Sequence, residues 1–253
     1  SSLPVYGTAT TAGIVFLVCL AGIFTFYKLL GELPKLSRRK LSDAQEVHYI
    51  KLITVIVFAA LLSAGWDVWW HRAIGRDSLW ELPHIFLYTL ASIGVCLGLY
   101  AWQHTGRRIW KKIATALLLV PLSAPFDNFW HVLFGVEDLS RPISLSWSPP
   151  HMLLDLSVIA TLVFLLSALH RHHKVKDEAF FASFIFGAIT SLSLFLVMPF
   201  HPTEGWGQVA GFWGAGALAA VFIGVMLAAQ HWMKNSVAAS MTTLFSLILM
   251  LSS

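Results

Sequence analysis

The chain has 253 residues, of which 57% are hydrophobic and 12% are charged, and its formal net charge is +4. A soluble domain carries about 25% charged residues, so this composition excludes a soluble globular enzyme, a disordered chain and a nucleic-acid-binding protein. A transmembrane β-barrel is disfavoured because the apolar stretches are continuous rather than alternating. We therefore predict an all-α, polytopic transmembrane helical bundle that forms a single domain over residues 1–253.

Eight apolar segments are candidate membrane spans, separated by the glycine, proline and charged residues typical of turns. In chain order they cover residues 8–30, 49–70, 82–103, 110–134, 150–169, 178–200, 206–230 and 236–252. The last segment is short and is diluted by serine and threonine, so the expected bundle has seven or eight helices.

The basic residues are distributed unevenly among the connections between these segments. Counted with their flanking helix turns, the connections after the odd-numbered segments hold 14 of the 17 Lys and Arg residues, and those after the even-numbered segments hold only Arg72, Arg76 and Arg141. Because cytoplasmic loops carry the excess of basic residues, we predict that the N-terminus and the even-numbered connections lie on the extracytoplasmic side of a bacterial-type inner membrane. The inner connections include the cluster at residues 170–174, which we interpret as charge facing the lipid headgroups.

The sequence also contains an internal repeat, over residues 50–103 and 110–169, in which each copy is a helical hairpin. Each copy carries the pattern Asp-x-aromatic-Trp-His-x-x-x-Gly, which begins at Asp67 in the first copy and at Asp127 in the second. A Pro-His pair then opens the following span. Both copies run in the same direction through the membrane, as in parallel repeats.

The repeat predicts two groups of metal-ligand residues at one side of the membrane. Aspartate and histidine at positions i and i+4 lie on one helical face, and the hairpin returns the second histidine to the same depth. The resulting groups are Asp67, His71 and His84 in the first copy, and Asp127, His131 and His151 in the second. One carboxylate and two imidazoles with an open position suit copper, zinc or non-haem iron.

The first group resembles the metal-ligand segment in the C subunit of the copper-containing membrane monooxygenases. The resemblance rests on the spacing Asp67-x3-His71-x12-His84, on residues 76–78 in the intervening loop and on Pro83. It extends over about residues 60–160. The second group is similar to the family's neighbouring site, although Asp127 stands where that site has Asn and the loop before the last histidine is longer.

This resemblance implies a copper-binding subunit of a multi-subunit membrane complex that carries out the oxygen-dependent oxidation of a small apolar substrate. It leaves open whether the two groups hold one dinuclear centre or two separate ions. Electrons would come from partner subunits, because no segment here is typical of a nucleotide or iron–sulfur cofactor site.

Three further polar residues are candidates for supporting the metal ligands. Asp155 lies one turn after His151 inside an apolar span, where an ionisable residue suggests a functional role. We expect it to orient His151, to act as a fourth ligand or to form an interhelical hydrogen bond. Asn128 neighbours Asp127, and His201 lies in a loop on the same predicted side.

Other functions fit parts of the same pattern. A non-catalytic metal-handling or structural subunit of a membrane redox complex would use the same ligands. A membrane cytochrome would bind haem between two histidines, but it would not require the aspartates. A transporter is a weaker alternative, because Asp155 alone marks a polar path through the spans.

Overall fold

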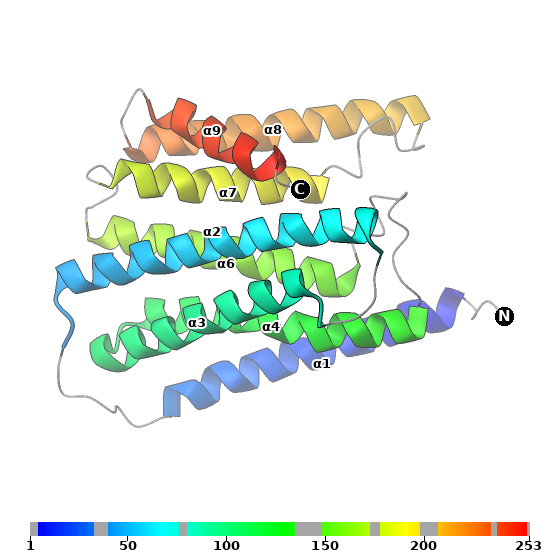
Figure 1. The fold of residues 1–253 in the computed structure, drawn as a ribbon, viewed down its shortest axis with the longest axis horizontal. Coiled ribbons are helices and arrows are strands. Elements are labelled where there is room, and N and C mark those ends of the chain that lie inside the picture. The colour runs from blue at the N-terminus through cyan, green and yellow to red at the C-terminus, as the bar shows by residue number, and fades with distance from the viewer. Residues whose placement is uncertain are drawn as a thin grey trace.

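The computed structural model describes residues 5–32, 40–75, 80–134, 148–172, 178–197, 207–233 and 237–251. Within these ranges the chain forms eight α-helices and no strand, which confirms the predicted all-α fold (Figure 1). The helices are α1 (Val5–Glu32), α2 (Asp43–Ala73), α3 (Leu82–Thr105), α4 (Arg108–Phe134), α6 (Pro149–Arg171), α7 (Ala179–Val197), α8 (Gly207–Met233) and α9 (Ala238–Leu251).

Four of these helices are long and apolar enough to cross a membrane. The qualifying segments are Asp43–His71 in α2, Leu82–Thr105 in α3, Arg108–Val132 in α4 and Pro149–Arg171 in α6. Large apolar side chains such as Phe86 and Leu122 are exposed on the outside of the bundle, as contact with lipid requires. These features are those of an integral membrane protein, and the crossing of the membrane by the other four helices stays a prediction.

Helix α2 begins six residues earlier than the sequence pattern predicted, at Asp43 rather than at residue 49. The cause is a capping box, in which the backbone N–H of Gln45 donates to the Ser42 hydroxyl and the Gln45 side chain accepts from the Ser42 backbone. This arrangement satisfies two backbone donors that a helix start otherwise leaves unpaired. The first turns of α2 are therefore helical although they are polar.

The central part of the bundle consists of α2, α3, α4 and α6. Helix α2 packs along α3 and α4 packs along α6, and α3 contacts α4 between the two pairs. Gly98 permits the last contact, because a Cβ atom at this position would lie 3.1 Å from the Ala114 Cβ. That the two helix pairs are copies of one hairpin unit stays a prediction.

The direction of the helices brings the two predicted ligand groups to one end of the bundle. Helices α2 and α4 finish at the end where α3 and α6 begin, and α1 also begins there (Figure 1). The opposite end holds the start of α2, the turn between α3 and α4, and the end of α6. The polar side chains at the two ends of the bundle are paired in different ways.

Candidate metal centre

Helices α2 and α3 bring Asp67, His71 and His84 together as predicted. Asp67 and His71 lie one turn apart on α2, and His71 Nε2 is 3.4 Å from Asp67 Oδ2. His84 approaches from the first turn of α3, where its Nε2 is 3.1 Å from Asp67 Oδ1. Pro83 is compatible with this first turn because a helix start leaves its backbone N–H groups unbonded. One carboxylate thus contacts imidazoles from two helices.

The geometry of this group fits a metal ion. One ligand atom from each of the three residues can be chosen so that all lie within 4.8 Å of one another. Two ligand atoms bound at about 2.0–2.1 Å to one tetrahedral ion would be roughly 3.3–3.4 Å apart. The two measured carboxylate–imidazole separations of 3.4 and 3.1 Å are close to this spacing.

The hydrogen bonding of the group is incomplete. The side chains of Asp67 and His71 are only 18% and 14% exposed. Asp67 Oδ1 and His71 Nδ1 are buried, and neither has a hydrogen-bond partner in the described part of the chain. His84 Nε2 lies only 3.1 Å from Asp67 Oδ1, but the two atoms are not aligned as a hydrogen-bond donor and acceptor. Close ligand-type atoms that are not aligned for hydrogen bonding are the arrangement expected around a shared ion.

An aromatic ring stacks on one ligand of the first group. Tyr88, one turn after His84, stacks on that imidazole with ring centroids 5.8 Å apart. This contact limits the rotation of His84, and it was not predicted from the sequence. On the same two helices, Trp66 makes an edge contact with Trp70, and its ring centroid lies 6.0 Å from that of Phe86.

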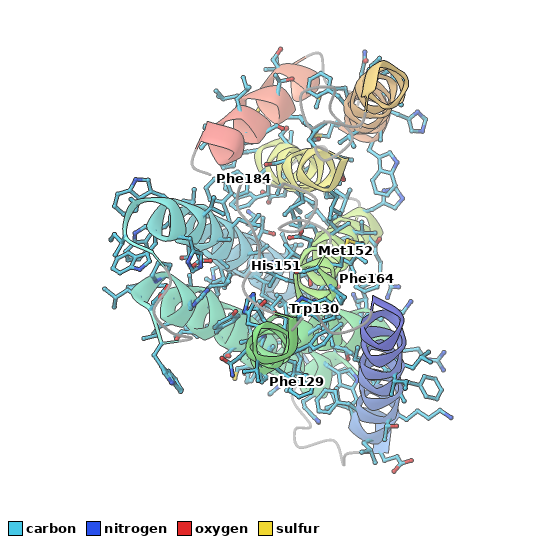
Figure 2. The ribbon with its side chains drawn as sticks, turned by 90° about the vertical axis from the view of Figure 1, so that its right-hand side faces the viewer. Phe129, Trp130, His151, Met152, Phe164 and Phe184 are labelled. Carbon is cyan, nitrogen blue, oxygen red and sulfur yellow. The ribbon has the colours of Figure 1, made fainter. Side chains whose placement is uncertain are left out.

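The second group is assembled more loosely, at the end of α4 and the start of α6. His131 Nδ1 is 3.3 Å from Asp127 Oδ2, while His151 Nε2 is 3.8 Å from Asp127 Oδ1. Figure 2 views the bundle from this end and shows His151 and Trp130 toward its middle. The structure therefore places both histidines beside Asp127, but these three residues are not among the groups whose ligand atoms all lie within 4.8 Å of one another in the described part of the chain.

Ser148 is a supporting residue that the sequence pattern did not identify. It is buried at the N-cap of α6, and its hydroxyl lies 2.8 Å from His151 Nδ1. With Asp127 near the other ring nitrogen, both nitrogens of His151 face polar groups other than Asp155. Ser148 thus has the orienting position that we predicted for Asp155. Glu81 is the buried N-cap residue at the matching place in α3, three residues before His84.

Of the remaining predicted residues, Asp155 does not join either group. Asp155 is buried farther along α6 and lines an apolar cavity. Asn128 is exposed, whereas the adjacent Asp127 is buried. His201 and residues 76–78 lie outside the described residues. The supporting roles of Asn128 and His201 therefore stay predictions.

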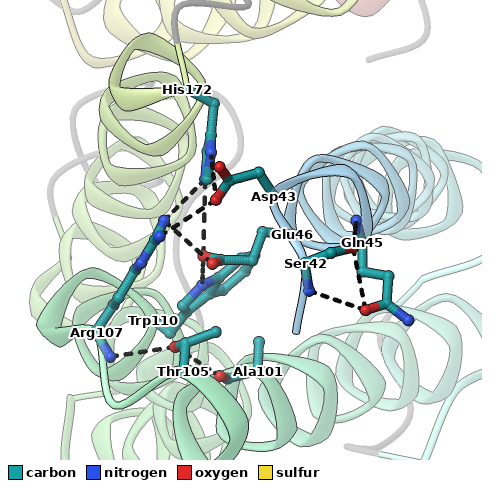
Figure 3. A network of polar contacts seen from close by, with 9 residues as sticks. All are labelled: Ser42, Asp43, Gln45, Glu46, Ala101, Thr105, Arg107, Trp110 and His172. Atoms are coloured by element: carbon teal, nitrogen blue, oxygen red, sulfur yellow. Dashed lines mark hydrogen bonds and ion pairs between the residues drawn. The ribbon is translucent and has the colours of Figure 1, made fainter. Parts of the chain in front are cut away.

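A third cluster of polar side chains lies at the opposite end of the bundle (Figure 3). Glu46 is at its centre, with only 2% of its side chain exposed, and it accepts a 2.8 Å hydrogen bond from Trp110 Nε1. Arg107 lies 3.1 Å from Glu46 and 3.2 Å from Asp43. His172 is 3.5 Å from Asp43 and 3.7 Å from Glu46. The cluster joins the start of α2 to α4 and to the residue that follows α6.

This third cluster corrects one interpretation made from the sequence. His172 belongs to the segment that we interpreted as charge facing lipid headgroups, yet its side chain is only 6% exposed. It is buried because Asp43 and Glu46, more than 120 residues earlier, supply carboxylates next to it. Asp43, Glu46 and His172 also have metal-ligand spacing. However, the Arg107 guanidinium already forms ion pairs with both carboxylates, so this cluster is an ion-pair network.

Comparison of the chain with protein-family models, with curated proteins and with solved structures finds no match. The function of the chain is therefore inferred from its candidate site residues and their geometry.

Replacing Arg107 with Ala should destabilise the bundle by roughly 1–3 kcal/mol. The change leaves the buried Glu46 carboxylate with less compensation, and removing one partner of a fully buried pair costs about 3–5 kcal/mol. The expected loss is smaller because the Arg107 side chain is 35% exposed. The measurement is unfolding in mixed micelles of increasing denaturing detergent.

Arg108→Ala is the matched control, because Arg108 is the adjacent residue and is exposed. It should change stability by less than about 0.5 kcal/mol. Equal effects of the two substitutions would show that the network does not stabilise the fold.

Proposed function

We propose that this chain is an integral-membrane metal-binding subunit in which Asp67, His71 and His84 hold one metal ion. The observation that carries the proposal is the buried Asp67 carboxylate, which contacts two imidazoles from two helices while one of its oxygens lacks a hydrogen-bond partner among the described residues. A buried carboxylate without full pairing is costly inside an apolar bundle. Binding a divalent cation would supply the missing partner.

Copper is the metal that we propose, with iron or zinc as alternatives. Imidazole ligands suit all three metals, and the resemblance of the Asp-His-His spacing to the copper monooxygenase C subunit favours copper. Three protein ligands leave a position open for a further molecule, which is typical of catalytic rather than purely structural sites. The second group, Asp127, His131 and His151, would hold a second ion or complete the first centre.

We further propose that the centre oxidises a small apolar substrate in a complex with other membrane subunits. Bound copper would supply the activation of dioxygen. The contribution of this chain is to supply the ligands and to hold His84 in place through the Tyr88 stack. The bilayer and the exposed apolar helix faces provide the route by which an apolar substrate would arrive.

The alternative is a non-catalytic subunit that handles or stores metal with the same ligands. It is favoured by the absence of an electron-donating cofactor motif in the sequence. Oxygen-dependent formation of a product by the intact complex, and its loss in His71→Ala, would support catalysis. Metal binding without any such product would support the alternative.

We also propose that both ligand groups lie near the extracytoplasmic surface. The support is the uneven distribution of Lys and Arg, which places the start of α2 on the basic, cytoplasmic side. In a chain with Cys19 and Cys96 replaced by Ser, an impermeant maleimide added to spheroplasts should label Val132→Cys. It should label Lys40→Cys only after permeabilisation, and the reverse pattern would contradict the orientation.

Metal content measured on the purified chain tests the binding proposal directly. After incubation with Cu²⁺ and removal of excess metal, the unsubstituted protein should retain about one ion for each occupied group. His71→Ala and His84→Ala should each weaken binding by 10-fold or more, because each removes one of three ligands.

His48→Ala is the matched control for these variants. His48 is an exposed histidine at the other end of the same helix, so its loss should leave the tightly bound metal unchanged. Low metal content that is equal in all four proteins would refute the proposal.

A further inference from the structure

The central helices and α7 line a partly open apolar cavity of about 50 Å³. Its walls are aliphatic side chains from α2, α3, α4, α6 and α7, among them Ala60, Leu87, Leu117 and Leu192. Asp155 of α6 is the one lining residue with a polar side chain. The cavity is close to both ligand groups along the chain, because Leu87 lies one turn after His84 and Asp155 lies one turn after His151.

The Asp155 carboxyl group is buried in this apolar wall. The residue is only 7% exposed, and its Oδ2 atom has no hydrogen-bond partner within the described part of the chain. The histidine one turn away does not supply one, because the ring of His151 faces Asp127 and Ser148. An unpaired buried polar group of this kind is costly, so the cavity calls for an occupant that offers a hydrogen bond.

The composition of the wall determines which occupants fit. A Ca²⁺ or Mg²⁺ ion requires about six oxygen ligands, whereas this cavity offers one carboxyl group. An ordered water molecule requires two to four polar partners, and here it would find the same single group. A molecule with a short aliphatic body and one hydroxyl group matches both parts of the wall.

The volume limits the size of that molecule. An apolar cavity of about 150 Å³ binds benzene, which has six heavy atoms, and about 10–15 Å³ is needed for one water. A cavity of about 50 Å³ therefore holds about two to four heavy atoms, which is the size of a C1–C3 alcohol.

We propose that this cavity is a binding site for short-chain alcohols, whose hydroxyl group hydrogen-bonds to Asp155 while the alkyl chain contacts the aliphatic wall. Either protonation state of the carboxyl group can make this bond, because an ionised carboxylate accepts from the hydroxyl and a protonated one also donates. The proposal depends on the cavity and Asp155 alone, so it stands whether or not the ligand groups hold metal.

The test is methyl NMR on the full chain in lipid nanodiscs, without added metal and with labelled Ile, Leu and Val methyl groups. Titration with 1-propanol should shift the Ile56, Leu87 and Leu117 methyl signals in a saturable way. The exposed Leu227 methyl groups report partitioning into lipid and should shift only in proportion to concentration. Propane, which lacks the hydroxyl group, should bind about 5-fold more weakly, as expected for the loss of one hydrogen bond.

Two variants separate the contributions of the carboxyl group and of the space. Asp155→Asn keeps a hydrogen-bonding group and should retain saturable 1-propanol binding, whereas Asp155→Leu should weaken it about 5-fold or more. Ala60→Leu fills the cavity and should abolish binding while leaving Asp155 in place. Unchanged signals from Leu227 and other distant methyl groups verify that each variant is folded. Non-saturable shifts in the unsubstituted chain, or equal 1-propanol affinity in Asp155→Leu, would overturn the proposal.

Discussion

The structure depends on one constraint, which is that a polar side chain inside an apolar helical bundle must find a polar partner. The two ends of the bundle meet this constraint differently. At one end Glu46 accepts from Trp110 and pairs with Arg107, so its charge is neutralised by the protein itself. At the other end Asp67 contacts two histidines, and one of its oxygens lacks a hydrogen bond among the described residues.

This contrast is the physical basis for assigning a metal site to one end only. Each end contains three carboxylate and histidine side chains within ligand distance of one another, which are Asp43, Glu46 and His172 at one end and Asp67, His71 and His84 at the other. At the Glu46 end, the Arg107 guanidinium lies within 3.2 Å of both carboxylates, and an added cation would be repelled there. Asp67 instead contacts two imidazoles, and Tyr88 stacks on one of them without adding a positive charge.

The sequence predicted the helices and the Asp-His-His groups because both depend on local spacing. Continuous apolar runs define spans, and residues at i and i+4 share a helical face whatever the rest of the chain does. Contacts between distant segments were missed, as for His172, whose carboxylate partners lie more than 120 residues away. The cap at Ser42 was missed because this residue was assigned to a loop. The contact of the Ser148 hydroxyl with His151 was also missed, and it occupies the position of one of the three roles expected for Asp155.

The most direct test of the central claim is to count the imidazoles bound to the metal in the first group. X-ray absorption at the metal edge should be measured on a loaded chain in which His131 and His151 are replaced by Ala, so that only the first group contributes. We predict scattering from two imidazoles, which falls to one when His84 is also replaced. A spectrum without imidazole scattering, or one that His84→Ala leaves unchanged, would contradict the assignment of Asp67, His71 and His84 as a metal centre.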